Sequence, residues 1–378
     1  MMEPYTLKKD NLYQTLRQEI LSGRYEPESR LPREIDFCRM LGVGKVTLRS
    51  ALEKLETDGL VVRVAGKGTF ISAGRRSNLI LVGIIKKSGM ELPQNYILPG
   101  IEAAATEQGF RTELCFIEYL RKLKPEKALK LLKEKNLCGV LLVTSSVMPD
   151  DPEVSLLRQL GLPVIIVHGR YEDRLTGFSL MYVNMRQAWK EGLEYLAGKG
   201  HRDIRIIGMP GSHDIRGWRK EELPGLFRSL GLNSEGCLVY PAVLETDSIR
   251  HAVNRILNDG GQPSAIFCFS DFYAMEVMAC LQEKGIRVPE DIAVMGYCGY
   301  PGATLLEPSL STIDLNYAGI GRASVELLAS AGSWFRVEDA AIPVVTIPYR
   351  IVERNSTRII RNDPNIFSRF NDNILEAK

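Results

Sequence analysis

The sequence lacks the features that mark a membrane protein, a secreted protein or a metal-binding scaffold. No stretch of its 378 residues approaches the ~18 consecutive apolar residues that a membrane-spanning helix needs. Its first residues have no basic-then-apolar run of the kind found in a secretory signal. The seven cysteines form no C-x-x-C pair and have no metal-like spacing to the four histidines. We therefore expect a cytoplasmic protein with reduced thiols, no membrane contact and no cofactor.

An excess of charge of one sign is also missing. Forty-eight Lys and Arg against forty-six Asp and Glu give a formal net charge of +2, which indicates no particular partner. The first 77 residues, however, hold fourteen basic and ten acidic side chains. A small basic segment on a near-neutral chain is a first indication of an anionic partner. The length predicts two or three domains.

The first seventy residues have the pattern of a small helical domain. Apolar residues at helical spacing predict helices over 11–23, 33–41 and 45–58. The last two are separated by a tight turn at 42–44, which contains two glycines. The helix over 45–58 has a continuous apolar stripe, formed by Leu48, Ala51, Leu52 and Leu55.

Two β-like runs follow these helices, at 60–64 and 69–71, with a glycine-containing turn between them. Two helices around a tight turn and then a hairpin are typical of a winged helix-turn-helix, whose second helix enters the major groove of DNA. We therefore predict such a domain over residues 1–72, called the head below, and a polar linker over 73–78. Five side chains lie where they can meet bases or phosphates: Lys45, Val46 and Arg49 at the start of the second helix, and Arg63 and Lys67 on the hairpin.

After residue 78 the pattern changes to short apolar strands that alternate with amphipathic helices. Seven strands are expected, at 79–85, 112–117, 139–144, 163–168, 204–208, 265–269 and 292–297. Doubly apolar strands separated by helices predict parallel α/β sheets covered on both faces. Since about 275 residues exceed what one such sheet usually takes, we expect two lobes over 79–357, called the body below, and a tail over 358–378. Ligands of such sheets bind beyond the carboxyl ends of the strands.

The motifs of the head resemble the DNA-binding domain of GntR-family regulators. They are Leu31-Pro32-Arg33-Glu34, the runs 41–52 and 66–71, and Gly59-Leu60. The resemblance implies DNA contacts from Arg33, from Lys45, Thr47 and Arg49 in the recognition helix, and from Lys67 and Gly68 in the wing. With their neighbours they make up the predicted DNA interface: Arg33, Glu34, Gly44, Lys45, Val46, Thr47, Arg49, Arg63, Lys67 and Gly68.

The head departs from the family pattern at three points. Gly44 stands in place of a serine cap, which costs only a few tenths of a kcal/mol. Lys45 replaces an arginine, so the charge is kept but bidentate recognition of guanine is lost. The order Arg33-Glu34-Ile35 replaces Ser-Glu-Arg, so one cation has moved. These departures affect the operator sequence that is expected, not DNA binding itself.

The body resembles the effector domain of LacI/GalR-type regulators, which share the fold of periplasmic sugar-binding proteins. The residues that carry this resemblance are 82–85, 100–104, 109–110, 139–142, 162–165, 200–204, 270–274, 285–291 and 354–357. A GntR-type head on a LacI-type body resembles the AraR subgroup of bacterial transcription regulators. The resemblance implies a small-molecule effector, a sugar or sugar derivative, bound in the interlobe cleft.

The same resemblance implies which residues hold the effector. Arg219, preceded by Trp218, falls at the ligand-binding arginine of the family, and Asp271 falls at its ligand-binding aspartate. A guanidinium suits sugar hydroxyls or a carboxylate because it offers paired N–H donors. The predicted effector-binding residues are Ser88, Glu91, Ser145, Arg170, Trp218, Arg219, Asp271 and Cys298.

Alternatives stay open for several of these residues. Two carboxylates of the family pattern are absent, at Cys298 and at Asn184-Met185, so a modified or acidic sugar is also an acceptable effector. Trp218 can belong to the core or stack on a sugar ring, and Asp271 can act as the N-cap of a helix over 272–284. Cys298 is typical of a small buried apolar residue. His168 and His201 are expected to pack rather than to bind metal.

Together these features predict a ligand-responsive, sequence-specific transcription regulator, a repressor of carbohydrate-related genes and not an enzyme. A homodimer is expected because one winged head makes few contacts, whereas two heads bind a palindromic double-stranded operator. A sugar-binding module of a transport system is disfavoured by the head. An enzyme on the α/β scaffold is disfavoured because the sequence has no nucleophile elbow, metal cluster or complete phosphate loop.

Overall fold

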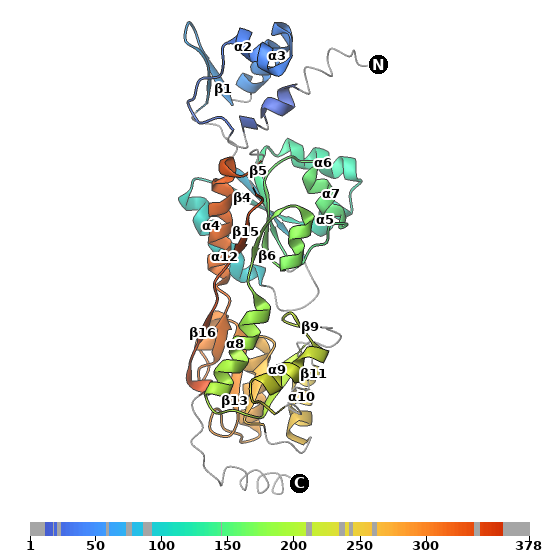
Figure 1. The fold of residues 1–378 in the computed structure, drawn as a ribbon, viewed down its shortest axis with the longest axis vertical. Helices are drawn as coiled ribbons and strands as arrows, with labels where there is room; N and C mark the ends of the chain where they lie inside the picture. The colour runs from blue at the N-terminus through green and yellow to red at the C-terminus, as the bar shows by residue number, and fades with distance from the viewer. Residues whose placement is uncertain are drawn as a thin grey trace. The chain divides into compact units, whose positions relative to one another are not determined.

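The computed structural model describes most of the chain and divides it into two compact units. The described residues are 12–17, 19–20, 24–57, 60–72, 78–85, 93–144, 146–208, 214–233, 239–241, 245–258, 263–335 and 341–357. Unit 1 comprises Met1–Lys87, Ile97–Tyr182 and Ala318–Val345. Unit 2 comprises Ser88–Tyr96, Val183–Tyr317 and Thr346–Lys378. Each unit is therefore assembled from segments that lie far apart in the sequence (Figure 1).

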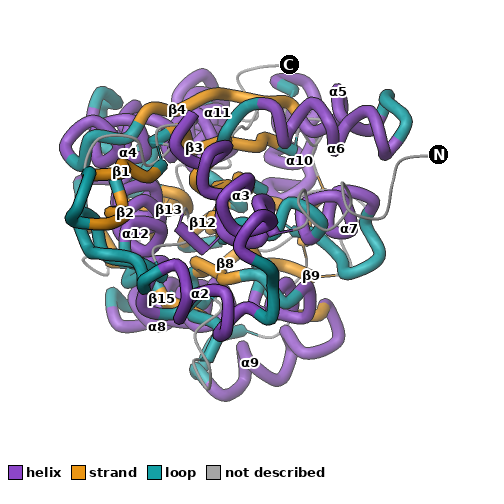
Figure 2. Tube along the Cα trace, turned by 90° about the horizontal axis from the view of Figure 1, so that it is seen from above, coloured by secondary structure: helices purple, strands orange, loops and turns teal. Residues whose placement is uncertain are grey.

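The head, at the start of unit 1, is a winged helix-turn-helix, as predicted. Residues 12–17 and 19–20 are helical, and α2 (Glu34–Leu41) and α3 (Lys45–Thr57) follow (Figure 2). The strands β1 (Val61–Val64) and β2 (Gly68–Ile71) pair antiparallel and form the wing.

The turn between α2 and α3 explains how the head folds. Gly42 adopts a left-handed conformation, with φ of 63°, and its N–H donates to the carbonyl of Cys38. Glycine takes this conformation without the steric cost that a β-carbon imposes. The apolar stripe of α3 is almost completely buried, and each of its three leucines contributes about 1.5–3 kcal/mol. The opposite face of α3 is therefore turned to solvent.

Unit 1 also holds a six-stranded sheet in the order β15-β7-β6-β5-β3-β4. The strands β3 to β7 pair in parallel. In Figure 1, α5, α6 and α7 lie on one side of this sheet and α4 and α12 on the other. The elements are β3 (Leu79–Ile84), α4 (Gln94–Glu107), β4 (Arg111–Phe116), α5 (Ile117–Arg121), α6 (Pro125–Glu134), β5 (Leu137–Val143), α7 (Pro152–Arg158), β6 (Val164–Gly169), η1 (Tyr171–Thr176), β7 (Ser179–Tyr182), α12 (Tyr317–Ala329), η5 (Ala331–Ser333) and β15 (Val344–Thr346).

The helices α4 and α12 cross with their backbones in contact. A β-carbon added to Gly100 of α4 would lie 2.0 Å from the carbonyl oxygen of Ala318 in α12. A β-carbon added to Gly321 of α12 would lie 2.3 Å from the carbonyl oxygen of Ile97 in α4. Both atoms that would be struck belong to backbone, so they cannot turn aside as the end of a side chain does. The crossing therefore needs glycine on both helices.

Unit 2 holds a second six-stranded sheet, in the order β11-β8-β12-β13-β14-β16, in which only β16 runs antiparallel to its neighbour. Its elements are α8 (Met185–Gly198), β8 (Ile204–Gly208), β9 (Asp214–Ile215), β10 (Trp218–Arg219), η2 (Lys220–Glu222), α9 (Leu223–Ser229), β11 (Val239–Pro241), α10 (Thr246–Asn258), β12 (Ala265–Cys268), α11 (Asp271–Glu283), β13 (Ala293–Cys298), η4 (Pro301–Thr304), β14 (Ser311–Asp314), β16 (Arg350–Val352) and η6 (Asn355–Thr357).

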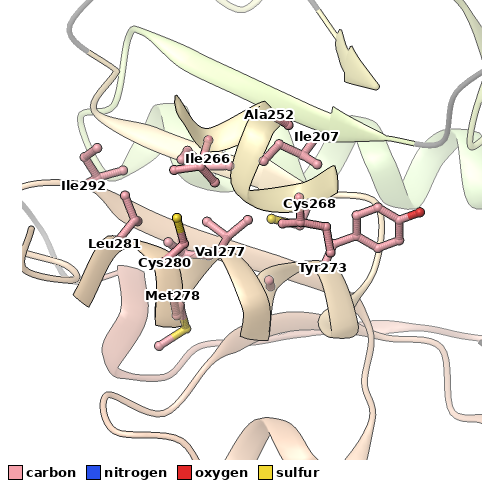
Figure 3. Close-up of a cluster of buried hydrophobic side chains, with 14 of the residues drawn as sticks. Ile207, Ala252, Ile266, Cys268, Tyr273, Val277, Met278, Cys280, Leu281 and Ile292 are labelled. Carbon is pink, nitrogen blue, oxygen red and sulfur yellow. The ribbon is translucent and has the colours of Figure 1, made fainter. Parts of the chain in front are cut away.

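Each face of the unit 2 sheet has its own apolar core. On one face α10 and α11 pack against the strands through a cluster that includes Ile207, Ile266, Val277 and Leu281 (Figure 3). On the other face Trp189 of α8 stacks on Phe267 of β12, with ring centroids 3.8 Å apart. Because helices cover both faces of this sheet, a ligand can reach it only at the ends of its strands. In parallel sheets the carboxyl ends of the strands position functional side chains.

The last described residues are fixed into unit 2 by a buried network of hydroxyl groups. The Ser356 hydroxyl donates to the carbonyl of Val294 at 2.6 Å and accepts from the backbone N–H of Ser311 at 2.9 Å. The Thr357 hydroxyl donates to the Ser311 hydroxyl at 2.7 Å. All three hydroxyl-bearing residues are fully buried.

The predicted fold class is confirmed. All seven predicted strands are present within two residues of their predicted ends, and the helices predicted at 33–41 and 45–58 begin and end within one residue. Residues 73–77 of the predicted linker and the whole predicted tail lie outside the described residues. The predicted domain boundaries stay predictions. Within the described part of the chain, no helix combines the length and apolar character that crossing a membrane requires.

Candidate functional site

The head carries a groove of about 580 Å³ between the start of α2, the exposed side of α3 and the wing. Four arginines line this groove, against one carboxylate, that of Glu34: Arg30, Arg33, Arg49 and Arg63. A concave surface with this excess of positive charge concentrates the field and attracts an anionic partner. The groove is therefore the head's candidate nucleic-acid interface.

Arg30 belongs to this groove although it was not among the predicted residues. Its backbone bridges to Phe70 at the edge of the wing. Gly68 has a φ of +116°, and a β-carbon there would lie 2.9 Å from the Arg30 Nε. Gly68 thus leaves the space in which the Arg30 side chain lies against the wing. The signal that could have identified Arg30 is its position directly before the Leu31-Pro32 motif.

Arg49 is held at the groove by Glu34. The Arg49 Nε donates to a carboxylate oxygen of Glu34 at 2.9 Å, and this hydrogen bond raises the pKa of the guanidinium. Both side chains are exposed to water, so a stronger anion can compete for the arginine. Glu34, which is predicted as part of the interface, therefore holds the Arg49 side chain in place at the groove.

Two of the residues predicted to contact DNA have side chains that are engaged or buried within the head. The Arg63 Nη2 donates to the carbonyl of Arg49 at 3.1 Å, and its Nε lies 3.6 Å from a carboxylate oxygen of Glu56. Arg63 therefore links the wing to α3 in place of extending toward a partner. Thr47 is only 8% exposed, so it has little surface to offer DNA.

The remaining predicted residues of the head lie on the surface. Arg33 forms the N-cap position of α2, and Lys67 and Gly68 lie at the tip of the wing. The Gly44 carbonyl accepts the first helical hydrogen bond of α3, from the Leu48 N–H at 3.0 Å. The helix thus begins without a side-chain cap and exposes Lys45 and Val46 at its N-terminal end.

In the body, the structure describes five of the eight predicted effector-binding residues. Ser88, Glu91 and Ser145 lie outside the described residues. Arg170 is exposed directly after β6 of unit 1, and its N–H donates to the buried Asp173 carboxylate at 2.8 Å. Burial raises the pKa of Asp173. The other four predicted residues belong to unit 2.

Trp218 and Arg219 lie on β10, a short strand that pairs with β9. The Trp218 indole N–H donates to the carbonyl of Arg186 at 2.8 Å, and the Arg186 guanidinium lies 3.6 Å above the centre of the indole ring. The Arg219 side chain is 73% exposed and lies 3.7 Å from the Glu222 carboxylate. Hydrogen bonds from Arg186 and from the Arg219 N–H lower the pKa of Glu222 to about 2. The carboxylate is thus ionised near pH 7 and ties β10 to η2.

Asp271 is fully buried at the start of α11, with its carboxylate hydrogen-bonded inside unit 2. One oxygen accepts the Tyr300 N–H at 2.6 Å, and the other accepts the Thr312 hydroxyl at 2.5 Å. Gly296 leaves room for this carboxylate, because a β-carbon there would lie 2.1 Å from its Oδ1. The alternative that Asp271 is the N-cap is wrong, since Ser270 holds that position and α11 includes Asp271.

In unit 2, Arg216 is a candidate site residue that was not among the predicted ones. It donates to the carbonyl of Phe269, just after β12, at 2.6 Å, and to the sulfur of Cys298, at the end of β13, at 3.7 Å. Its guanidinium lies 3.8 Å from the ring centre of Phe269 and 4.3 Å from that of Tyr297. Cys298 itself is 2% exposed. A cation is thus fixed between two aromatic rings at the carboxyl ends of two parallel strands.

The described residues offer no group of three or more His, Cys, Asp or Glu side chains that could hold a metal ion. His168 and His201 are both buried. Burial lowers the pKa of His201 to about 4, so its imidazole is neutral near pH 7. These positions fit the packing role that the sequence predicts for the two histidines.

Two family models match the chain. The model for bacterial regulatory proteins of the gntR family matches residues 8–71, and the model for a periplasmic binding protein-like domain matches residues 193–357. An arabinose metabolism transcriptional repressor of Geobacillus stearothermophilus is 24% identical, over 95% of this chain and 100% of the relative. The HTH-type transcriptional repressor PurR of Photobacterium profundum is 27% identical, over 70% of this chain and 75% of the relative.

Solved structures of LacI-type regulators resemble the chain in fold. The lac repressor dimer bound to operator and the anti-inducer ONPF matches with a TM-score of 0.59 and 20% identity, over 76% of this chain and 96% of that chain. A LacI family regulator from Enterococcus faecium with bound ribose matches with a TM-score of 0.56 and 18% identity, over 74% of this chain and 100% of that chain. These likenesses show the fold, and the two family models match a gntR-type head and a periplasmic binding protein-like domain, as the resemblance inferred from the sequence implies.

Proposed function

We propose that this chain, in which a GntR-type winged helix-turn-helix is joined to a LacI-type, periplasmic-binding-protein-like body, is a ligand-responsive transcription repressor that binds specific DNA sequences. The observation that carries the proposal is the start of α3, which exposes Lys45 and Val46 beside the arginine-lined groove. The arabinose metabolism repressor and PurR, to which the chain is similar, are both named as repressors, which supports a regulator rather than an enzyme. A repressor acts on the chromosome, so a cytoplasmic protein follows from the proposal.

In the proposed complex α3 lies in the major groove of double-stranded DNA with its N-terminal end toward the bases. Lys45 and Arg49 contact bases or phosphates, Arg33 contacts a phosphate at the start of α2, and Lys67 follows the backbone from the wing. The exposure of these four cations supports this placement. A homodimer would present two heads to a palindromic operator, which multiplies the specificity of one head.

The DNA-binding part of the proposal is tested with the full-length protein and genomic duplexes. We expect selective retention of a small set of promoter fragments over shuffled duplex at physiological salt. Lys45→Ala removes one cation from each head of the dimer, so it should weaken specific binding at least about 10-fold and reduce the slope of log affinity against log salt by about two. Lys127→Ala, which removes an exposed lysine of α6 in the body, is the matched control and should leave both quantities unchanged. A chain that prefers no genomic fragment, with or without metabolite extract, contradicts the proposal.

We further propose that the body binds a small polar effector, a sugar or sugar derivative, that changes the affinity of the heads for DNA. The names of the arabinose repressor and of the ribose-bound regulator support this class of ligand. Only an effector with different affinities for two arrangements of the protein can act in this way. The location of the effector in the interlobe cleft stays a prediction, as do the predicted contacts from Arg170, Trp218, Arg219, Asp271 and Cys298.

Arg216 joins these candidates because it lies at the carboxyl ends of β12 and β13, where ligands of parallel sheets bind. A thermal-shift screen of sugars and sugar acids on the full-length protein tests its role. A ligand at a hundred times its dissociation constant should stabilise the protein by about 2.7 kcal/mol and alter retention of the operator. Arg216→Ala should abolish the shift, whereas Arg219→Ala, on the exposed strand β10, should reduce it less. Equal shifts in the two variants contradict the assignment of Arg216.

A further inference from the structure

One apolar side chain of the recognition helix is not explained by the packing of the head. Among the described residues of α3, Val46 is the one large apolar side chain that stays exposed, at 63%. The buried stripe Leu48, Ala51, Leu52 and Leu55 lies on the opposite side of the helix, because successive residues turn by about 100°. Arg49, three residues further on, shares the face of Val46.

Helix stability does not explain this residue either. A β-branched side chain loses rotamer freedom in a helix, so valine is a weaker helix former than alanine at an exposed position. Its isopropyl group makes no hydrogen bond, and most of its surface is open to water. An exposed valine at this position is explained if a partner outside the head contacts its isopropyl group and removes that group from water.

The neighbours of Val46 restrict the chemistry of that partner. Lys45 precedes it, Arg49 shares its face, and the arginine-lined groove adjoins Arg49, so the partner is strongly anionic and offers one apolar group at this place. In the major groove of DNA the only apolar group on a base edge is the 5-methyl of thymine. Cytosine, the other pyrimidine, offers an amino donor there, which Val46 would desolvate without a hydrogen bond.

We propose that Val46 contacts the 5-methyl group of a thymine in each half-site of the operator and so sets one base preference of the protein. This inference rests on the proposed function and adds the identity of a base to it. It also accounts for a departure of the sequence at the recognition helix: beside a lysine that acts as a point charge, an apolar contact supplies discrimination that the missing arginine does not.

The test removes the methyl group of one thymine from the DNA and, in a separate variant, the Val46 side chain from the protein. The operator selected by the full-length protein is synthesised with each thymine, on either strand, replaced in turn by deoxyuridine, which keeps the base pair and lacks the methyl. We expect one thymine in each half-site at which deoxyuridine weakens binding about fourfold, or about 15-fold when both half-sites are changed. Val46→Ala, which changes both heads at once, should bind the unmodified operator about 15-fold more weakly and should be insensitive to deoxyuridine at those positions.

Two further variants keep the result interpretable. Val344→Ala, which shortens an exposed valine of β15 in the body, should bind both duplexes as the wild type does. Val46→Thr keeps one methyl group and should retain part of the sensitivity. The Val46 variants should melt as the wild type does, because the side chain is exposed.

The outcomes separate this inference from the proposed function. If the wild type still selects an operator but binds every deoxyuridine duplex as tightly as the thymine duplex, the assignment of Val46 is wrong and the repressor proposal stands. The assignment is also wrong if Val46→Ala keeps the deoxyuridine effect. If the protein selects no sequence at all, the proposed function fails first and this inference fails with it.

Discussion

Replacing Gly100 by alanine is expected to destabilise unit 1 by about 3 kcal/mol or more. The added β-carbon would lie 2.0 Å from the carbonyl oxygen of Ala318, so α4 and α12 would have to separate and lose the contacts between them. Overpacking of this kind usually costs about 1–3 kcal/mol, and a clash with backbone lies at the upper end of that range. Urea denaturation followed by circular dichroism measures the loss, and hydrogen exchange of peptides from α4 and α12 assigns it to unit 1.

The matched control is Gly198→Ala at the end of α8. This glycine is exposed, and a β-carbon there meets no atom within 4 Å. Alanine should therefore be neutral or stabilise the helix by up to about 1 kcal/mol. Gly321→Ala should behave like Gly100→Ala, because its β-carbon would lie 2.3 Å from the Ile97 carbonyl. A Gly100→Ala protein as stable as the wild type would show that the two helices do not cross this closely.

Replacing Asp271 by alanine is expected to destabilise unit 2 by about 3 kcal/mol. The change removes the acceptor of two buried donors, the Tyr300 N–H and the Thr312 hydroxyl, and each unsatisfied donor costs about 1–3 kcal/mol. Asp271→Asn keeps one acceptor oxygen and should cost less. The measurement is chemical denaturation, with hydrogen exchange in β13, β14 and α11 as the local readout.

Asp247→Ala provides the comparison for this effect, since it removes an exposed carboxylate from the first turn of α10 in the same unit. It should cost no more than about 1 kcal/mol. An Asp271→Ala protein with unchanged stability but no thermal shift from the effector would assign the carboxylate to ligand binding. Loss of stability, by contrast, would assign it to the connection between α11 and the strands.

The parts of the fold that could be predicted are those in which burial depends on apolar residues alone. The stripe of α3 and the strand β3 are of this kind, because their periodicity and composition determine which side chains are removed from water. The strand β14 was missed because Ser311 and Thr312 are polar. They are nevertheless fully buried, since hydroxyl groups from the distant residues 356 and 357 and the Asp271 carboxylate satisfy their hydrogen bonds. Local sequence carries no sign of such long-range partners.

In the candidate site, too, the local sequence does not show which single residues make long-range contacts. Lys45 and Val46 could be placed on the exposed end of α3 because the buried stripe defines the opposite face. Thr47 has a polar side chain that suggests DNA contact, yet tertiary packing buries it. Arg216 was missed because its position depends on a left-handed backbone conformation, with φ of 51°, that lets it reach the ends of β12 and β13. A motif three residues later drew the prediction to Arg219.

The interleaved segments of unit 1 have a consequence for synthesis on the ribosome. The helix α12 packs against α4 through Gly321 and Gly100, which are about 220 residues apart in the chain. At a translation rate of about 5–20 residues per second, α4 emerges roughly 10–40 s before the helix that covers it. During that interval the nascent chain exposes the side of α4 that α12 will cover, while the long central segment of unit 2, Val183–Tyr317, is being made. Chaperones that shield apolar nascent segments are therefore expected to act on this polypeptide between the emergence of α4 and the emergence of α12.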